Sequence, residues 1–187
     1  KNPVNPVNPV QIYIFIKLDS IPSRGKSMKI AIYQCEGVSG SKEDNLKLLS
    51  EAAQSAAEQG AQLLICPEMF LSGYNIGDAV FELAEPADGP AFQSAAAIAR
   101  EAGIALLYGY PERHEAQVYN SALLIDRDGV ALANYRKTHL YGPEENRLFQ
   151  KGNDFVITEL DGVKIGILIC YDVEFPEAVR NLALAGA

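Results

Sequence analysis

Cys170 is the residue of this sequence that is best placed to act as a nucleophile. It follows the apolar run Val163–Ile169 and precedes a segment, 171–177, that is typical of the start of a helix. A thiol at the turn between a buried strand and a helix lies beside backbone N–H groups that can bind an oxyanion. Cys66 also follows a strand, but the next residue is a proline, which has no N–H to donate. The pattern favours Cys170, against the alternative that every cysteine is a small core residue.

A cysteine needs a base or a cation nearby to form a thiolate near neutral pH. Three side chains at predicted strand ends compete for this role: Glu68, Lys137 and His139. Because strand ends at one edge of a sheet converge, Glu68, Lys137 and Cys170 could meet in one pocket. A carboxylate among apolar neighbours has a raised pKa, which suits proton exchange near neutrality. Spacing alone leaves two alternatives open, a Cys170–His139 pair and a Glu68–Lys137 ion pair without a catalytic role.

The elements that must position these side chains begin at Met28, where strands and helices start to alternate. Apolar runs predict strands, and apolar residues at helical spacing predict helices behind a Ser41 cap and behind Pro90. Asp-Gly pairs between apolar runs predict two hairpins. The predicted strands are 29–34, 63–66, 104–110, 119–125, 130–135, 155–160 and 164–170, and the helices are 41–60, 90–101 and one from about 176. Parallel units combined with hairpins predict an α/β fold with a mixed sheet.

The composition argues against several kinds of partner. The net charge is -8 and the pI about 4.8, and the basic residues are scattered, which argues against nucleic acid and against anionic membrane surfaces. No apolar run is long enough to span a bilayer. The three widely spaced cysteines, Cys35, Cys66 and Cys170, predict neither a disulfide framework nor a metal site. We therefore expect a protein of the reduced cytoplasm.

The first 27 residues differ from the rest of the chain. They contain three copies of Asn-Pro-Val and then the apolar patch Ile12–Ile16, which is too short for a secretory signal. We predict an unstructured extension over 1–27 without a role in the fold, and a single folded domain over 28–187.

Three segments of that domain together resemble the motifs of the nitrilase superfamily of carbon-nitrogen hydrolases. In order along the chain they are Cys66-Pro67-Glu68-Met69-Phe70, Tyr135-Arg136-Lys137-Thr138-His139-Leu140 and Cys170-Tyr171-Asp172-Val173-Glu174-Phe175-Pro176-Glu177. The resemblance covers 28–187 and implies an αββα sandwich with mixed sheets. It also implies a catalytic triad of Glu68, Lys137 and Cys170, and a second glutamate after the lysine, for which Glu145 is the better match.

The resemblance further implies a chemistry. Cys170 would attack the carbonyl carbon of a small amide, and a thioester would be hydrolysed to the carboxylic acid, with release of ammonia and with no metal or organic cofactor. Lys137 and the N–H of Tyr171 would hold the oxyanion. True nitrilases resemble one another in a tryptophan after the cysteine, and this sequence contains none, so the aliphatic-amidase branch is favoured. From their proximity to the motifs, the residues expected to line the substrate pocket are Tyr74, Tyr141 and Glu174.

Members of this superfamily continue well past the helix that follows the cysteine. The resemblance therefore implies that this chain lacks its C-terminal part and that the full-length protein forms a homo-oligomer. Two other functions stay open: a catalytically impaired remnant that acts as a binding module, and a related glutaminase or acyl-transfer activity.

Overall fold

The computed structural model describes residues 12–16 and 28–187, which form alternating strands and helices. In chain order the elements are β1 (Ile12–Ile16), β2 (Ile30–Ile32), α1 (Lys42–Glu58), β3 (Leu63–Ile65), α2 (Ala79–Leu83), α3 (Pro90–Ala102), β4 (Ala105–His114), β5 (Gln117–Ile125), β6 (Ala131–Arg136), α4 (Gly142–Leu148), β7 (Ile157–Leu160), β8 (Val163–Ile169), the 3-10 turn η1 (Cys170–Glu174) and α5 (Pro176–Leu184). Within the described residues, no helix is both long and apolar enough to cross a membrane.

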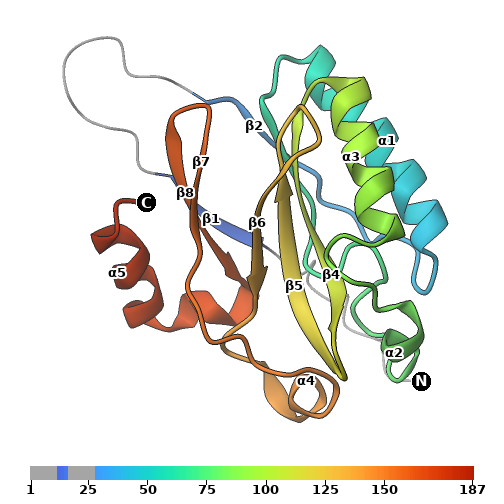
Figure 1. Ribbon diagram of the computed structural model, residues 1–187, viewed down its shortest axis with the longest axis vertical. Coiled ribbons are helices and arrows are strands. Elements are labelled where there is room, and N and C mark those ends of the chain that lie inside the picture. Colours follow the sequence, from blue (N-terminus) through green and yellow to red (C-terminus); the bar gives the residue numbers. More distant parts are fainter. Residues whose placement is uncertain (1–11, 17–27) are drawn as a thin grey trace, which may run out of the picture.

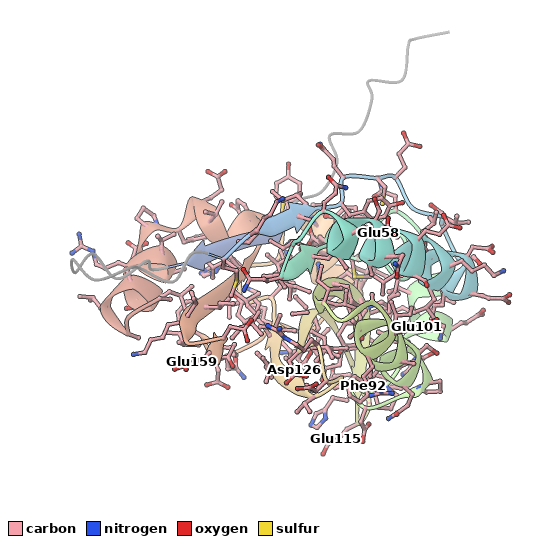
Figure 2. All side chains as sticks on the ribbon, turned by 90° about the horizontal axis from the view of Figure 1, so that it is seen from above. Glu58, Phe92, Glu101, Glu115, Asp126 and Glu159 are labelled. Carbon is pink, nitrogen blue, oxygen red and sulfur yellow. The ribbon has the colours of Figure 1, made fainter. Side chains whose placement is uncertain are left out.

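These elements stack in four layers (Figure 1). Helices α1 and α3 cover one face of a five-stranded sheet, a three-stranded sheet packs on its other face, and α5 covers the outside of the second sheet. The view from above in Figure 2 places Glu58 of α1 and Glu101 of α3 on one side of the molecule and Glu159 of β7 on the other. The αββα sandwich that the resemblance implied is confirmed, and of its two sheets the five-stranded one is mixed.

The order of the strands determines which ends lie together. In the five-stranded sheet, β2-β3-β4-β5-β6, the first three strands are parallel, and β5 and β6 are each antiparallel to the preceding neighbour. Strand β6 therefore runs in the same direction as β3, so the C-terminal ends of both strands lie at one edge of the sheet. In the other sheet, β1-β8-β7, the antiparallel strand β8 is central. The cysteine that follows β8 is thus delivered by a strand that is paired on both sides.

The buried pattern of β8 explains how the layers pack. A Cβ atom at Gly166 would lie 2.9 Å from a methyl carbon of Leu182 in α5, so this face of β8 is turned toward that helix. Since side chains alternate along a strand, Ile165 and Ile167 point to the opposite face, where they are fully buried with residues of the five-stranded sheet. The absence of a side chain at position 166 lets α5 approach the strand closely.

The prediction that residues 1–27 have no role in the fold is wrong for residues 12–16. Strand β1 pairs antiparallel with β8, with Ile12 opposite Ile169 and Ile16 opposite Ile165. An apolar patch rich in β-branched residues favours a strand, and β8 offers the backbone N–H and C=O groups that such a strand can pair. The other residues of the predicted extension, 1–11 and 17–27, lie outside the described residues.

The local signals predicted most elements but not all of them. The turn between β7 and β8 has positive φ at both Asp161 (53°) and Gly162 (79°), as a tight hairpin turn requires, and both predicted hairpins are confirmed. The sequence did not predict that β4 and β5 also form a hairpin around Glu115. Pro111 interrupts the apolar pattern there, and prolines are normally rare inside strands. The short helices α2 and α4 were not predicted either.

Gly109 of β4 allows the segment after β3 to cross over its neighbouring strand. A Cβ atom at position 109 would lie 2.4 Å from the backbone N of Met69 and 2.8 Å from Cα of Glu68. The crossing is fixed by the bond from the Gly109 N–H to the Pro67 carbonyl, 3.3 Å, and by the bond from the Leu71 N–H to the Gly109 carbonyl, 3.1 Å. This approach carries Glu68 beyond the end of its own strand toward β5 and β6.

We expect Gly109→Ala to destabilise the protein by about 1–3 kcal/mol, because the added methyl group must displace backbone atoms rather than a flexible side chain. The measurement is urea-induced unfolding of both proteins. An unfolding free energy within about 0.5 kcal/mol of the wild type would show that the segment does not depend on this close approach.

Candidate active site

Glu68 is buried and uses only one of its two carboxylate oxygens. Its exposure is 2%. Atom Oε1 accepts hydrogen bonds from Nζ of Lys137, at 2.7 Å, and from Nδ2 of Asn120, at 2.6 Å. Atom Oε2 is buried and has no hydrogen-bond partner among the described residues. Burial raises the pKa of Glu68, the charge of Lys137 opposes this, and that of Glu145 adds to it, so the net direction is upward.

Lys137 follows β6 and is completely buried. Its Nζ donates to Oε1 of Glu68 and, at 2.9 Å, to Oε1 of Glu145. An ammonium has three donors, so one donor of Lys137 is still available. Burial alone would lower the pKa of Lys137, but the charges of Glu68 and Glu145 outweigh burial and raise it. The side chain therefore remains a cation at neutral pH.

Glu145, in α4, holds Lys137 from the other side. Its Oε1 also accepts a bond of 2.6 Å from the Tyr74 hydroxyl, and its Oε2 accepts a bond of 2.7 Å from the backbone N–H of Tyr141. Both oxygens of Glu145 are thus engaged. The structure brings the two predicted pocket residues Tyr74 and Tyr141 together at this carboxylate.

Cys170 lies at the junction of β8 and η1, in a conformation that is rare for its residue type. Its φ is 45°, in the left-handed region, where a side chain is strained. Burial raises the pKa of its thiol to about 11; the negative charges of Glu68 and Glu145 add to this, and Lys137 opposes it. The thiol is therefore protonated at neutral pH. All three charged groups lie near enough to act on the sulfur, so the structure assembles the predicted residues at one place.

The other two cysteines lie in different surroundings. Cys66 is buried in the layer between the five-stranded sheet and helices α1 and α3, and burial raises its pKa well above the ordinary value. Cys35 is half-buried against the same layer, and burial raises its pKa as well. In the described part of the chain, neither thiol has a carboxylate and an ammonium beside it as Cys170 does.

Of the remaining residues that the sequence proposed for the site, one lies at the pocket, and the other two form no hydrogen bond with Cys170 within the described residues. The ring of Tyr171 packs edge-on against Tyr141, with centroids 5.3 Å apart, and so lies at the predicted pocket. Glu174 is exposed in η1, and among the described residues it makes no hydrogen bond or ion pair with the triad. His139 places Nδ1 2.8 Å from Oδ1 of Asp172 and forms no hydrogen bond with Cys170 in the described part of the chain. The geometry thus provides no Cys170–His139 pair.

Two buried polar residues of the site were not found from the sequence. Asn120 of β5 holds Glu68, and its Oδ1 is buried without a partner among the described residues. Asp172 is fully buried two residues after Cys170 and accepts five hydrogen bonds. Two features of the sequence could have indicated these residues. Asn120 is a polar residue inside an apolar run, and Asp172 is a carboxylate just after Cys170.

A cavity of about 340 Å³ adjoins this cluster. Its lining combines the glutamate that holds Lys137 with aromatic and aliphatic side chains, and it includes Tyr74, Tyr141, Pro143, Glu145, Leu148 and Phe149. Polar groups that converge at one end of a largely apolar cavity are typical of small-molecule sites.

Comparisons with known proteins agree with this geometry. The chain is 54% identical over 165 residues to the protein "Hydrolase in pqqF 5'region" of Pseudomonas protegens, covering 87% of this chain. It is 39% identical over 160 residues, 86% of the chain, to an (R)-stereoselective amidase of a Pseudomonas species. Among solved structures, an amidase from Nesterenkonia sp. superposes with a TM-score of 0.78 at 38% identity, covering 88% of this chain. Variants of that amidase are described in complex with butyramide, and with the acetamide moiety of fluoroacetamide attached to the active-site cysteine.

These matches cover only part of the known proteins. The chain spans 57% of the length of each of the two Pseudomonas relatives and 64% of the Nesterenkonia amidase chain. The profile of one family, described as carbon-nitrogen hydrolase, matches residues 29–187, which is nearly all of the domain predicted from the sequence. With its sandwich fold and this match, the chain belongs to the carbon-nitrogen hydrolase family.

Proposed function

We propose that this protein hydrolyses the C–N bond of a small amide through a thioester on Cys170, with Glu68 as the general base and Lys137 as the cation. The observation that carries the proposal is the distribution of hydrogen bonds around Lys137. Glu145 uses both oxygens to hold other groups, whereas Oε2 of Glu68 has no hydrogen-bond partner among the described residues. Within that part of the chain, Glu68 is therefore the one of the two carboxylates with an oxygen that can take a proton.

In the first step, the sulfur of Cys170 attacks the amide carbonyl carbon while Glu68 Oε2 accepts the thiol proton. A raised pKa suits Glu68 to this exchange, because the proton must later be given up again. The proton then passes to the departing nitrogen, the C–N bond breaks, and an amine or ammonia leaves. The carbon–sulfur bond that remains is the thioester.

In the second step, Glu68 activates a water molecule, which attacks the thioester carbonyl carbon. The carbon–sulfur bond breaks, the carboxylic acid is released, and the proton returns to the sulfur. In both steps negative charge develops on the carbonyl oxygen. The third donor of Lys137 and the N–H of Tyr171 supply hydrogen bonds to this oxyanion, and such donors are worth about 10²–10³ in rate.

The relatives and the adjoining cavity support a small amide as the substrate. The cavity, of about 340 Å³, is lined by Glu145 and by apolar side chains such as Leu148 and Phe149, and it has room for a small acyl group beside the cluster. We further propose a reduced cytoplasmic setting, since the three cysteines are all free, and a homo-oligomer as the whole protein. The direct experiment supplies butyramide and measures ammonia and butyric acid.

The outcomes of that experiment separate hydrolysis from acyl transfer and from a binding module. Equal amounts of ammonia and acid support hydrolysis. Transfer of the butyryl group to an added amine, without free acid, would instead assign an acyl transferase. If no ammonia is released, and an alkylating reagent labels Cys170 no faster than Cys35 and Cys66, the chain is a binding module.

Glu68→Gln should lower amide turnover by about 10²–10⁴-fold, the usual contribution of general acid–base catalysis. The same variant should keep Cys170 reactive toward iodoacetamide, because removal of the negative charge of Glu68 lowers the thiol pKa. Turnover is followed by ammonia release and labelling of Cys170 by peptide mass spectrometry.

The matched control is Glu101→Gln, since Glu101 is exposed on α3 on the outer helix layer (Figure 2). It should leave both measurements unchanged. Hydrolysis within about tenfold of the wild type in the Glu68 variant would contradict the role of Glu68 as the base.

The alkylation rate of wild-type Cys170 should keep rising with pH beyond the ordinary cysteine pKa of 9.0, because burial raises its pKa to about 11. The thiolate fraction, and with it the rate, should increase roughly tenfold per pH unit through pH 9. The measurement is the initial rate of iodoacetamide labelling at several pH values. A plateau near pH 9 would show that burial and the two glutamates do not act on this thiol as described.

A further inference from the structure

Asp172 is the most densely hydrogen-bonded side chain near the site, and the proposed chemistry does not use it. Its Oδ2 accepts a bond of 2.8 Å from the Tyr135 hydroxyl and one of 3.0 Å from the backbone N–H of Ile169. Its Oδ1 accepts bonds from the Thr138 hydroxyl, 2.9 Å, the His139 N–H, 2.9 Å, and His139 Nδ1, 2.8 Å. The residue has no exposed surface. A buried carboxylate requires such donors, and here all of its capacity as an acceptor is used.

The donors come from two segments that belong to different sheets. Ile169 is the last residue of β8, and Cys170 lies between it and Asp172. Tyr135 is in β6, and Thr138 and His139 follow that strand. Lys137 lies within this second segment. The carboxylate therefore fastens the turn that carries the nucleophile to the segment that carries the ammonium.

The backbone conformation of Cys170 requires hydrogen bonds that hold its turn in place. A residue with a side chain at a φ of 45° persists only where its surroundings hold it there. The bond from the Ile169 N–H to Asp172 closes the turn directly around the cysteine. The bonds from Tyr135 and Thr138 then fix that turn relative to β6.

We propose that Asp172 is a positioning residue, which holds the Cys170 turn in register with Lys137 and Glu68 across the two sheets without contacting the substrate. The effect on turnover rests on the proposed function, whereas the effect on the surroundings of the thiol does not. Releasing Asp172 lets the Cys170 turn relax away from the cluster, so the reacting groups lose their alignment.

Glu112 offers a matched comparison inside the same protein. It is a buried carboxylate that accepts four hydrogen bonds, from Ser121, Asn134 and Arg136, where Asp172 accepts five. All of these lie in the five-stranded sheet with Glu112 itself, so they do not join the two sheets. Removing its charge disturbs a buried network to a similar extent but leaves the Cys170 turn in place.

The test compares Asp172→Asn with Glu112→Gln. For Asp172→Asn we expect kcat for butyramide to fall about 100-fold, as for a misplacement of about 1 Å. KM should stay within about threefold, since the lost interaction acts on the reaction and not on binding. The pKa of Cys170, read from the midpoint of its alkylation rate against pH, should fall from about 11 toward 9.0, because the released thiol is better solvated. Glu112→Gln should change none of these, even where both variants unfold at lower urea concentrations.

A milder pair covers the case in which Asp172→Asn does not fold. Tyr135→Phe removes one donor to Asp172, and Tyr110→Phe removes a hydroxyl that bonds Asn134 at 3.0 Å, away from the site. Both tyrosines are buried in the five-stranded sheet. Tyr135→Phe should lower kcat about tenfold and shift the alkylation profile in the same direction, whereas Tyr110→Phe should do neither.

The proposal is overturned if folded Asp172→Asn keeps the kcat and the alkylation profile of the wild type. It is equally overturned if Asp172→Asn does not fold and Tyr135→Phe behaves like Tyr110→Phe in both readouts. Absence of turnover in the wild type would remove the hydrolase proposal alone, since the alkylation profiles would still decide whether Asp172 positions the thiol.

Discussion

A fully buried ammonium between two carboxylates constrains how this site is built. Moving an ion out of water costs several kcal/mol, and removing one partner of a buried pair costs about 3–5 kcal/mol. Lys137 can therefore remain buried only while Glu68 and Glu145 both reach it. Each glutamate comes from a different element, so the loop after β3, the end of β6 and helix α4 must fold together. The cost of the buried charge makes their arrangement cooperative.

The same cluster determines how the proton of Cys170 would move in the proposed reaction. Two carboxylates and one ammonium leave an excess of negative charge around the sulfur, which together with burial keeps Cys170 in its thiol form. A cysteine beside a lone cation would ionise in advance, whereas under the proposed mechanism Cys170 passes its proton on as it attacks. Oε2 of Glu68, which has no hydrogen-bond partner among the described residues, is the proposed acceptor of that proton.

The sequence predicted those parts of the fold that depend on neighbouring residues. The Ser41 cap accepts a bond from the Asp44 N–H as its spacing predicted, and Asp161-Gly162 forms its tight turn, since both are determined within a few residues. The predicted helix from Pro90 is also present. Glu145 was assigned through resemblance alone, because nothing in its own helix distinguishes it from Glu144.

The rest of the site could not be predicted because its partners are distant in sequence. Asn120 meets Glu68 across 52 residues, and that contact requires both the strand order and the crossing at Gly109. The pairing of β1 with β8 joins segments about 150 residues apart. No local sequence pattern specifies with which strand an apolar segment will pair. Long-range pairing is decided by the whole sheet.

The candidate site is built from residues of two sheets, so the two sheets must be aligned with each other. Apolar packing alone does not fix that alignment. Glu68 and Lys137 follow strands of the five-stranded sheet, whereas Cys170 follows β8 of the other. Hydrophobic contact between the sheets is strong but non-directional, so it fixes their separation better than their alignment. Hydrogen bonds are directional and weaken steeply when bent, and the five at Asp172 join both sheets at the nucleophile. We infer that packing brings Glu68, Lys137 and Cys170 together and that this buried carboxylate aligns them.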